Sequence, residues 1–371
     1  MRGNVVGEWK QDINPYFFFI HQYSIMGKQR EVETNMKQIR KSILPVTAGL
    51  IALLLVTAGG WGYYRYIVNR IPTEEIDSGK TYQYHYMLIA DNISSPLWQA
   101  IYQSAKEAAA KENAYLEYVG GDMVSEYNTD DYLEIAIAAK ADGIIVEPNG
   151  DPEVERLINK ASANNIPVVT VMEDASGTKR KSFIGVNSFQ LGQEYGEVIC
   201  KTMTEATRKI LVLINGDIED PSKNLTFSQI KSEIKEHSPY GAQVEIDALR
   251  INSGSTFESE EAIRDVFLDS QILPDILVCL DEIDTKCAYQ ALIDYNKVGQ
   301  MDIIGYYPTE SFLNAISRGT TSAAFELDTE QIGRYSVEAL REYREMGYVS
   351  EYFSVDLELI TKENVAEYME E

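Results

Sequence analysis

Short apolar runs rich in Val and Ile alternate with amphipathic stretches along most of the chain after residue 81. Most of these runs are continuous rather than alternating, which is typical of strands buried on both faces of a parallel sheet. The runs predict strands at 84–90, 115–119, 143–146, 167–171, 182–186, 209–214, 244–251, 276–280 and 302–305.

Helical stretches separate several of the predicted strands. They include residues 96–112, 151–164, 189–203 and 258–269. Alternation of strands and helices indicates right-handed βαβ units, in which helices cover both faces of a parallel sheet. With this many strands, the pattern predicts an α/β fold with two sheets rather than one.

An uncharged apolar run, residues 42–64, precedes the α/β region. As a helix, residues 44–64 would be about 31 Å long at about 1.5 Å per residue, enough to span the hydrocarbon core of a membrane. Basic residues lie on its N-terminal side and aromatic residues cluster at its far end, which predicts a single transmembrane helix with a cytoplasmic segment 1–43. Residues 65–81 are the expected linker to an extracellular domain. The competing interpretation is a signal peptide that is cleaved near Gly59.

Charge is distributed unevenly along the chain. Residues 1–70 carry nine Lys or Arg and four Asp or Glu, a net charge of +5, and the remaining residues carry a net charge of −30. So acidic a region repels phosphate backbones, and nucleic acid is not expected as a partner. The cysteines Cys200, Cys279 and Cys287 have no metal-ligand spacing and are expected to be free thiols. The three histidines are scattered along the sequence, so a histidine-based metal site is not predicted. No other cofactor is expected.

One segment has a sequence pattern that is more informative than its periodicity alone. It comprises residues 139–174, AKADGIIVEPNGDPEVERLINKASANNIPVVTVMED. An Ala-Asp-Gly entry into a strand, a helix start at Asp151-Pro152 and an Ile-Pro-Val-Val strand resemble the sugar-type periplasmic-binding and lactose-repressor superfamily. SFIGVNSFQLGQEYGEVI, DILVCLDEIDTKCAYQAL, DIIGYYPTESFLNAI and VDLELITKEN resemble later elements of that family in the same order. The resemblance extends over nearly all of residues 82–362.

The resemblance implies a type I periplasmic-binding-protein domain at 82–371, with two Rossmann-like lobes joined by three crossing segments. One lobe would comprise about 82–184 and 328–354, and the other about 185–326 and 355–371. Ligands of open α/β sheets bind beyond the carboxyl ends of the strands. Residues that directly follow the strands are therefore the candidate ligand-binding residues.

Several of these positions differ from the family pattern. Glu173 stands where sugar-binding members commonly carry Arg, and Glu326 stands where Gln is usual. Asp281 replaces a usual Asn, and Tyr307 replaces an Asp. Trp98 keeps one of two aromatic residues expected in the first loop, where it either stacks on the ligand or packs in the helix core. The candidate ligand-binding residues are Ser95, Trp98, Glu173, Thr226, Asp281, Tyr307 and Glu326.

The three acids in this set constrain the ligand. Either each is a solvated rim residue, or all three face one cleft, where desolvation would cost several kcal/mol each without compensation. In the second case the ligand is a polyol rich in donors, a cation, or a molecule that enters with a metal. Anionic ligands such as sugar phosphates are expected to bind poorly.

The predicted function is that of a membrane-tethered extracellular solute-binding protein. It would deliver a small ligand to an ABC-type importer or present it to a membrane sensor such as a histidine kinase in the same membrane. The alternative is a carboxylate-dependent enzyme acting on a carbohydrate, but the chain contains no G-x-S-x-G, P-loop or HExxH motif. A DNA-binding regulator would need a basic helix-turn-helix where the apolar run lies.

Overall fold

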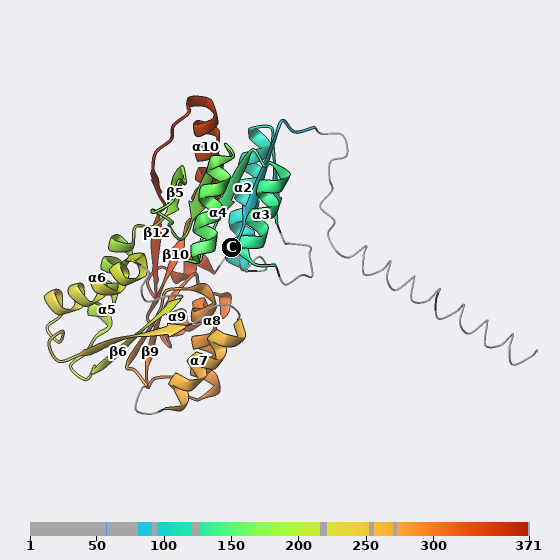
Figure 1. Cartoon of the computed structure of the whole chain (residues 1–371). Helices are drawn as coiled ribbons and strands as arrows, with labels where there is room; N and C mark the ends of the chain where they lie inside the picture. Colours follow the sequence, from blue (N-terminus) through green and yellow to red (C-terminus); the bar gives the residue numbers. More distant parts are fainter. Residues whose placement is uncertain are drawn as a thin grey trace, which may run out of the picture. The chain divides into compact units, whose positions relative to one another are not determined.

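The computed structural model describes residue 57 and residues 81–90, 95–119, 127–215, 221–251, 256–269 and 273–369 (Figure 1). The chain divides into two compact units, Met1–Lys80 and Thr81–Glu371. The predicted transmembrane segment lies outside the described residues except for Thr57. Within the described part, none of the helices is both long and apolar enough to cross a membrane.

The second unit contains two six-stranded sheets. The first has the order β11-β5-β4-β3-β1-β2, and all of its pairs are parallel. Its strands are β1 (Tyr84–Ile89), β2 (Ala114–Tyr118), β3 (Gly143–Val146), β4 (Val168–Val171), β5 (Ser182–Gly185) and β11 (Tyr352–Ser354). Its helices are α2 (Pro96–Lys111), α3 (Thr129–Ala139), α4 (Pro152–Ala163) and α10 (Thr329–Met346).

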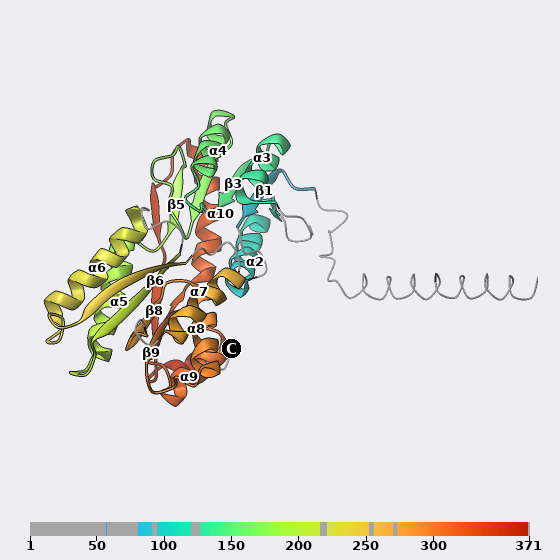
Figure 2. The same ribbon diagram turned by 60° about the horizontal axis from the view of Figure 1, so that its bottom comes forward.

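Helices cover both faces of the first sheet. Successive strand residues point to opposite faces, so neighbouring residues of one strand belong to different cores. Helices α2 and α10 share one core with Leu88, Ile145 and Val169, whereas α3 and α4 share another with Ile89 and Ile144. The two helix layers can be followed in Figure 2. This double burial explains why the strand sequences are continuous apolar runs.

The second sheet has the order β12-β10-β9-β8-β6-β7 and is parallel except for the antiparallel pair β10–β12. Its strands are β6 (Lys209–Asn215), β7 (Glu245–Ile251), β8 (Ile276–Cys279), β9 (Asp302–Tyr306), β10 (Ala323–Leu327) and β12 (Leu357–Thr361). Its helices are α5 (Ser188–Thr202), α6 (Pro221–His237), α7 (Thr256–Leu268), α8 (Glu282–Asp294), α9 (Glu310–Arg318) and the 3-10 turn η1 (Val365–Tyr368). The predicted two-lobed α/β architecture is confirmed.

The chain passes between the sheets three times, and the crossing segments contact one another. They connect β5 to α5, β10 to α10, and β11 to β12. The backbone of Val355 donates to the Gly185 carbonyl at 3.1 Å, and the backbone of Asp328 donates to the Asp356 carbonyl at 3.2 Å. Gln331 also donates to the Asp356 carboxylate at 2.6 Å. The three connections therefore form one hydrogen-bonded bundle.

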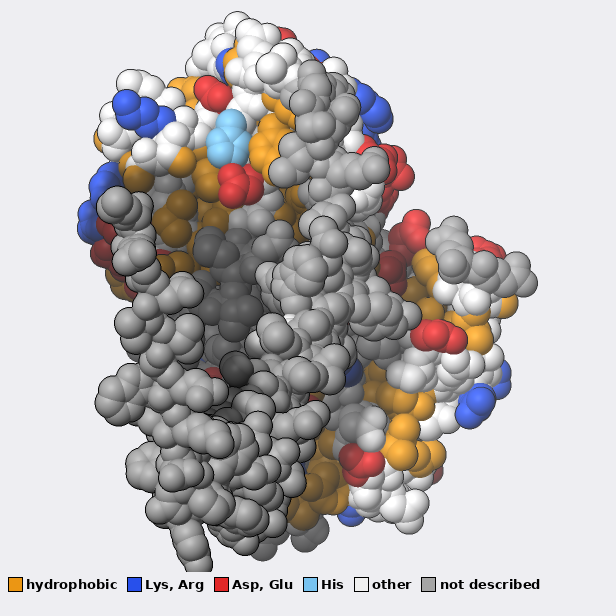
Figure 3. All heavy atoms as spheres, turned by 90° about the vertical axis from the view of Figure 1, so that its right-hand side faces the viewer, with side chains coloured by type: hydrophobic (Ala, Val, Ile, Leu, Met, Phe, Trp, Pro, Cys, Tyr) orange, Lys and Arg blue, Asp and Glu red, His pale blue; other side chains and the backbone are white. Residues whose placement is uncertain are grey.

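Polar and aromatic side chains of the edge strand β2 contact His85 of the neighbouring strand β1. The His85 ring stacks on Tyr115 with ring centroids 5.8 Å apart, and its Nε2 lies 2.8 Å from Glu117. A histidine beside acidic and hydrophobic side chains is visible on the face shown in Figure 3. Placing charged side chains on an edge strand is a common protection against pairing with other chains.

Candidate functional site

The carboxyl ends of the strands carry the three acids that the sequence analysis selected and a fourth, Glu147, that it did not. In the first lobe, Glu147 follows β3 and Glu173 follows β4 by one further residue. In the second lobe, one residue separates Asp281 from the end of β8, and Glu326 is the next-to-last residue of β10. Parallel strands end at the same edge of a sheet, so each lobe presents its acids on one edge.

Tyr306 is the residue whose hydroxyl is influenced by the charges of all four acids. It is the last residue of β9, its side chain is 7% exposed, and its backbone N–H donates to the Thr285 hydroxyl at 2.8 Å. Burial raises the pKa of the Tyr306 phenol well above its usual range, and the carboxylates of four acids raise it further. These acids are Glu173, Asp281, Glu147 and Glu326. The charges of acids from both lobes thus act on a single hydroxyl.

Tyr307, the tyrosine predicted for the site, lies one residue beyond the strand. Its φ of 45° falls in the left-handed region, and its backbone N–H donates to the Phe325 carbonyl at 2.7 Å. Burial, followed by the charges of Glu326 and Glu282, raises the pKa of Tyr307 to about 12. The predicted strand 302–305 extends to Tyr306 in the structure, so the sharp bend comes after Tyr306 rather than before it.

The first lobe has a similar bend at the corresponding place. Met172, directly after β4, has a φ of 64°, and its backbone N–H donates to the Ile184 carbonyl at 3.0 Å. Left-handed backbone at a non-glycine residue costs on the order of 1 kcal/mol and is often found at ligand sites. In both lobes the bend lies beside a residue of the site, Glu173 in one and Tyr306 in the other.

A hydrogen bond joins the lobes away from the crossing segments. The Ser95 hydroxyl, at the N-cap of α2, donates to the carboxylate of Glu282 in the first turn of α8. Both side chains are buried, at 4% and 8% exposed. Burial raises the pKa of the Glu282 carboxyl, and the Asp281 charge acts in the same direction. The sequence predicted Ser95 as a site residue but not Glu282. The signal that could have indicated Glu282 is its position directly after Asp281.

Tyr195 is a second residue that sequence reasoning missed. Its hydroxyl donates to the carbonyls of Cys279, at 2.9 Å, and Gly305, at 3.1 Å. These carbonyls belong to the ends of β8 and β9, which position Asp281 and Tyr306. Tyr195 is a positioning residue, since one phenol fixes both strand ends. A tyrosine inside an amphipathic helix gives no sequence signal for this role.

Two of the predicted site residues are buried in packing contacts. Trp98 is 3% exposed and belongs to the core shared by α2 and α10. Thr226 was expected in the region after strand 209–214, but the structure places it inside α6, where its hydroxyl donates to the Ser188 carbonyl at 3.2 Å. Its backbone also lies against Gly192 of α5. Ligand contact by Trp98 and Thr226 remains a prediction.

Comparison with known proteins identifies the family. A family model described as the periplasmic binding protein domain matches residues 86–347, well over half of the chain. The chain belongs to the periplasmic binding protein family. A search of curated proteins finds no match.

Solved periplasmic binding proteins share the fold of this family member. GanP, a glucose-galactose binding protein from Geobacillus stearothermophilus, matches with a TM-score of 0.67 and 20% identity over 76% of this chain and 98% of its own. XylFII in a XylFII–LytSN complex matches with 0.64 and 23% identity over 75% and 98%. A sugar-binding protein of a sugar ABC transporter from Bacillus halodurans matches with 0.62 and 19% identity over 76% and 99%. At these identities the similarity shows the fold alone.

Two further predictions of the sequence concern cysteines and metals. The cysteines of this periplasmic binding protein are free thiols located in α5, β8 and α8, as expected, and Cys279 and Cys287 are buried. In the ranges that the structure describes, no group of three His, Cys, Asp or Glu side chains is arranged to hold a metal ion.

Proposed function

We propose that this protein is an extracellular solute-binding protein that closes its two lobes over a small polar, sugar-like ligand. The observation that carries the proposal is the placement of acids at the carboxyl ends of strands in both lobes, Glu147 and Glu173 in one and Asp281 and Glu326 in the other, where the charges of all four act on Tyr306. A site assembled from two lobes is complete only when the lobes approach each other, which couples binding to closure. The Ser95–Glu282 hydrogen bond supports the same coupling.

The bound form would serve either an ABC-type importer or a membrane sensor. Two structures with this fold support these alternatives: one is described as part of a sugar ABC transporter, and XylFII is found in a complex with LytSN. Both uses require a surface that differs between the open and closed forms.

The apolar segment 44–64 is proposed to remain as an uncleaved anchor in the membrane. The uncharged run, its basic N-terminal flank and its aromatic C-terminal end support this proposal. We expect protein extracted from membranes to keep its residues N-terminal to the segment. N-terminal sequencing or intact-mass measurement tests this, and a mature N-terminus near Gly59 would show that the segment is a cleaved signal peptide.

A thermal-shift screen of the purified full chain against sugars and polyols tests the binding function. A ligand at 100 times its dissociation constant should stabilise the folded state by about 2.7 kcal/mol, a rise of several degrees in melting temperature. The ligand should be recovered unchanged, because the proposed role is binding and not turnover. Conversion of the ligand would favour the enzyme alternative.

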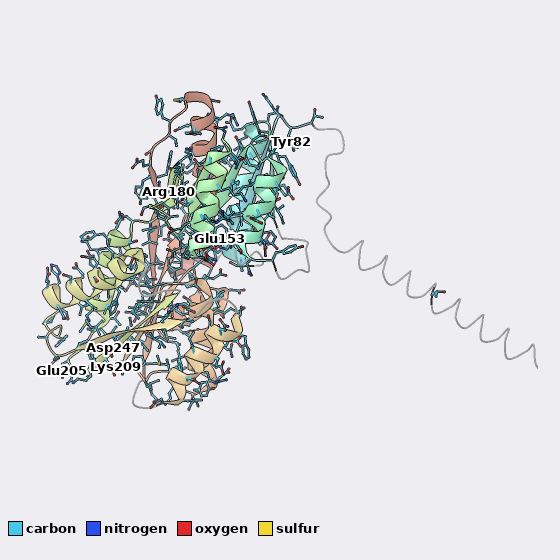
Figure 4. All side chains as sticks on the ribbon, viewed as in Figure 1. Tyr82, Glu153, Arg180, Glu205, Lys209 and Asp247 are labelled. Atoms are coloured by element: carbon cyan, nitrogen blue, oxygen red, sulfur yellow. The ribbon has the colours of Figure 1, made fainter. Side chains whose placement is uncertain are left out.

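A pair of charge-neutralising variants locates the binding. Glu173→Gln should reduce the ligand-induced shift, since it removes an acid from the site. Glu205→Gln should leave it unchanged, because Glu205 is exposed and lies near Lys209 and Asp247 at the far end of the second lobe (Figure 4). Equal effects of the two substitutions would contradict the assigned site.

A further inference from the structure

Two tyrosines at strand ends lie near the site, and one of them, Tyr118, has a hydroxyl with no hydrogen-bond partner among the described residues. The hydroxyl oxygen of Tyr118, the last residue of β2, is buried and unpaired within that part of the chain. The other, Tyr306, is a buried residue, and the hydrogen bond that the structure describes for it is made by its backbone N–H. Buried polar groups in native proteins nearly always have a partner, so the unpaired hydroxyl of Tyr118 indicates that a bound molecule completes it.

The two phenols come from opposite lobes, and the charge of Glu147 acts on both. Tyr118 is paired with Leu88, and Leu88 with Ile145, so Glu147, two residues further along, emerges on the same face of the first sheet as Tyr118. Tyr306 ends β9 in the second lobe, and the Glu147 charge acts on both phenols. The charge of one acid of the first lobe therefore acts on a phenol of each lobe.

Both phenols are hydrogen-bond donors at every physiological pH. Burial is the largest cause that raises the pKa of Tyr118 and of Tyr306, and the neighbouring carboxylates raise both values further. The ring of Tyr118 is held in place by Tyr102, with centroids 4.9 Å apart and planes 27° from parallel. The site thus combines fixed neutral donors with carboxylate acceptors.

This combination selects a particular ligand group. A hydroxyl both accepts and donates, so one hydroxyl can accept from a phenol while it donates to a carboxylate. An ammonium group can only donate, and an ionised phosphate oxygen can only accept. We propose that Tyr118 and Tyr306 donate to hydroxyl oxygens of a neutral polyol, and that the polyol donates in turn to the Glu147 carboxylate. The inference rests on the proposed function and names the residues and ligand class of that site.

Substitution by phenylalanine provides a direct test, because it removes the hydroxyl and keeps the ring. In the full chain, Tyr118→Phe and Tyr306→Phe should each weaken binding about tenfold, because a ligand hydroxyl loses its donor in a buried site. Without ligand, neither variant should unfold at a lower temperature than the wild type, since no described hydrogen bond is lost. Tyr289→Phe is the matched control: Tyr289 is a partly buried tyrosine that packs on Phe312, with ring centroids 5.5 Å apart, in the other core of the second lobe.

Calorimetric titration measures these affinities with defined probes: D-glucose, D-galactose, D-xylose and myo-inositol as neutral polyols, and D-glucosamine and D-glucose 6-phosphate as charged ones. The expected result is tightest binding of a neutral probe, weakened by both phenylalanine variants and not by Tyr289→Phe. If a neutral probe binds and both variants bind it as tightly as the wild type, the inference is wrong while the proposed function stands. Tighter binding of a charged probe overturns the ligand class, and binding of none of the six overturns both proposals.

Discussion

Among single residues, Glu282 has the clearest energetic consequence. Its carboxyl is buried and lies beside Asp281, and these two causes outweigh the Ser95 hydrogen bond and the Lys286 charge, which act in the opposite direction. The pKa of Glu282 is therefore raised above its ordinary value of 4.5. A carboxyl group with a raised pKa in the folded state binds protons more strongly there than in the unfolded chain. Its contribution to stability is fully present below pH 4.5 and is lost as the pH rises through the raised value.

Replacing Glu282 by glutamine should remove the loss of stability that occurs when the Glu282 carboxyl ionises. The amide oxygen still accepts from Ser95, so Glu282→Gln should raise the free energy of unfolding at pH 7 by about 1 kcal/mol. The difference from the wild type should disappear as the pH falls below 4.5, where both side chains are neutral. Urea unfolding across this pH range measures it, with Glu205→Gln as a control. Destabilisation at pH 7 would show that the charged form of Glu282 is the one that the fold favours.

The sequence anticipated the site only in part, and the reasons are local. Glu173 and Asp281 could be chosen because they follow predicted strands, and Glu326 because of its place in the family resemblance, but the role of each depends on how the backbone bends at the strand ends. Which of two successive tyrosines lies among the acids is decided by the length of β9 and by the left-handed conformation of Tyr307. Neither is encoded in a residue pattern, so Tyr306 was missed. Tyr118 was missed because an edge strand gives no hint of an unpaired hydroxyl.

At the scale of elements, prediction succeeded where local pattern and burial agree. The strand 143–146 was predicted with its observed bounds, and the other predicted strands are displaced by one residue at most. Helix α6 was not predicted, because its first turn is polar and follows a stretch typical of loops; Pro221 begins it at a position where proline is favoured. Strand β11 is three residues long and pairs only with distant β5. Its existence depends on tertiary contacts that no local window contains.

For the whole two-lobed unit, the crossing segments determine how closure can occur. Each is only a few residues long, and they are hydrogen-bonded to one another through Gly185, Asp328 and Asp356. Such segments permit rotation of one lobe against the other while both sheets stay intact, because the dihedral changes are absorbed at the ends of elements.

Closure should be visible in solution. Small-angle scattering of the purified full chain should give a smaller radius of gyration with saturating ligand than without it. A sugar that causes no thermal shift serves as the control and should leave the radius unchanged. Equal radii with and without a bound ligand would contradict a mechanism in which the lobes close.

The placement of β11 and β12 also constrains how the protein is made. These two strands are outer strands of different sheets, yet both come from residues 352–361, which follow the other strands of both sheets in the sequence. Translation proceeds from the N-terminus, so neither sheet can be completed until residues 352–361 have been synthesised. Until then β5 and β10 are open edges, the kind of surface that pairs with other unfinished chains. Nascent chains of this protein therefore depend on the synthesis of residues 352–361 to protect the edges of both lobes at once.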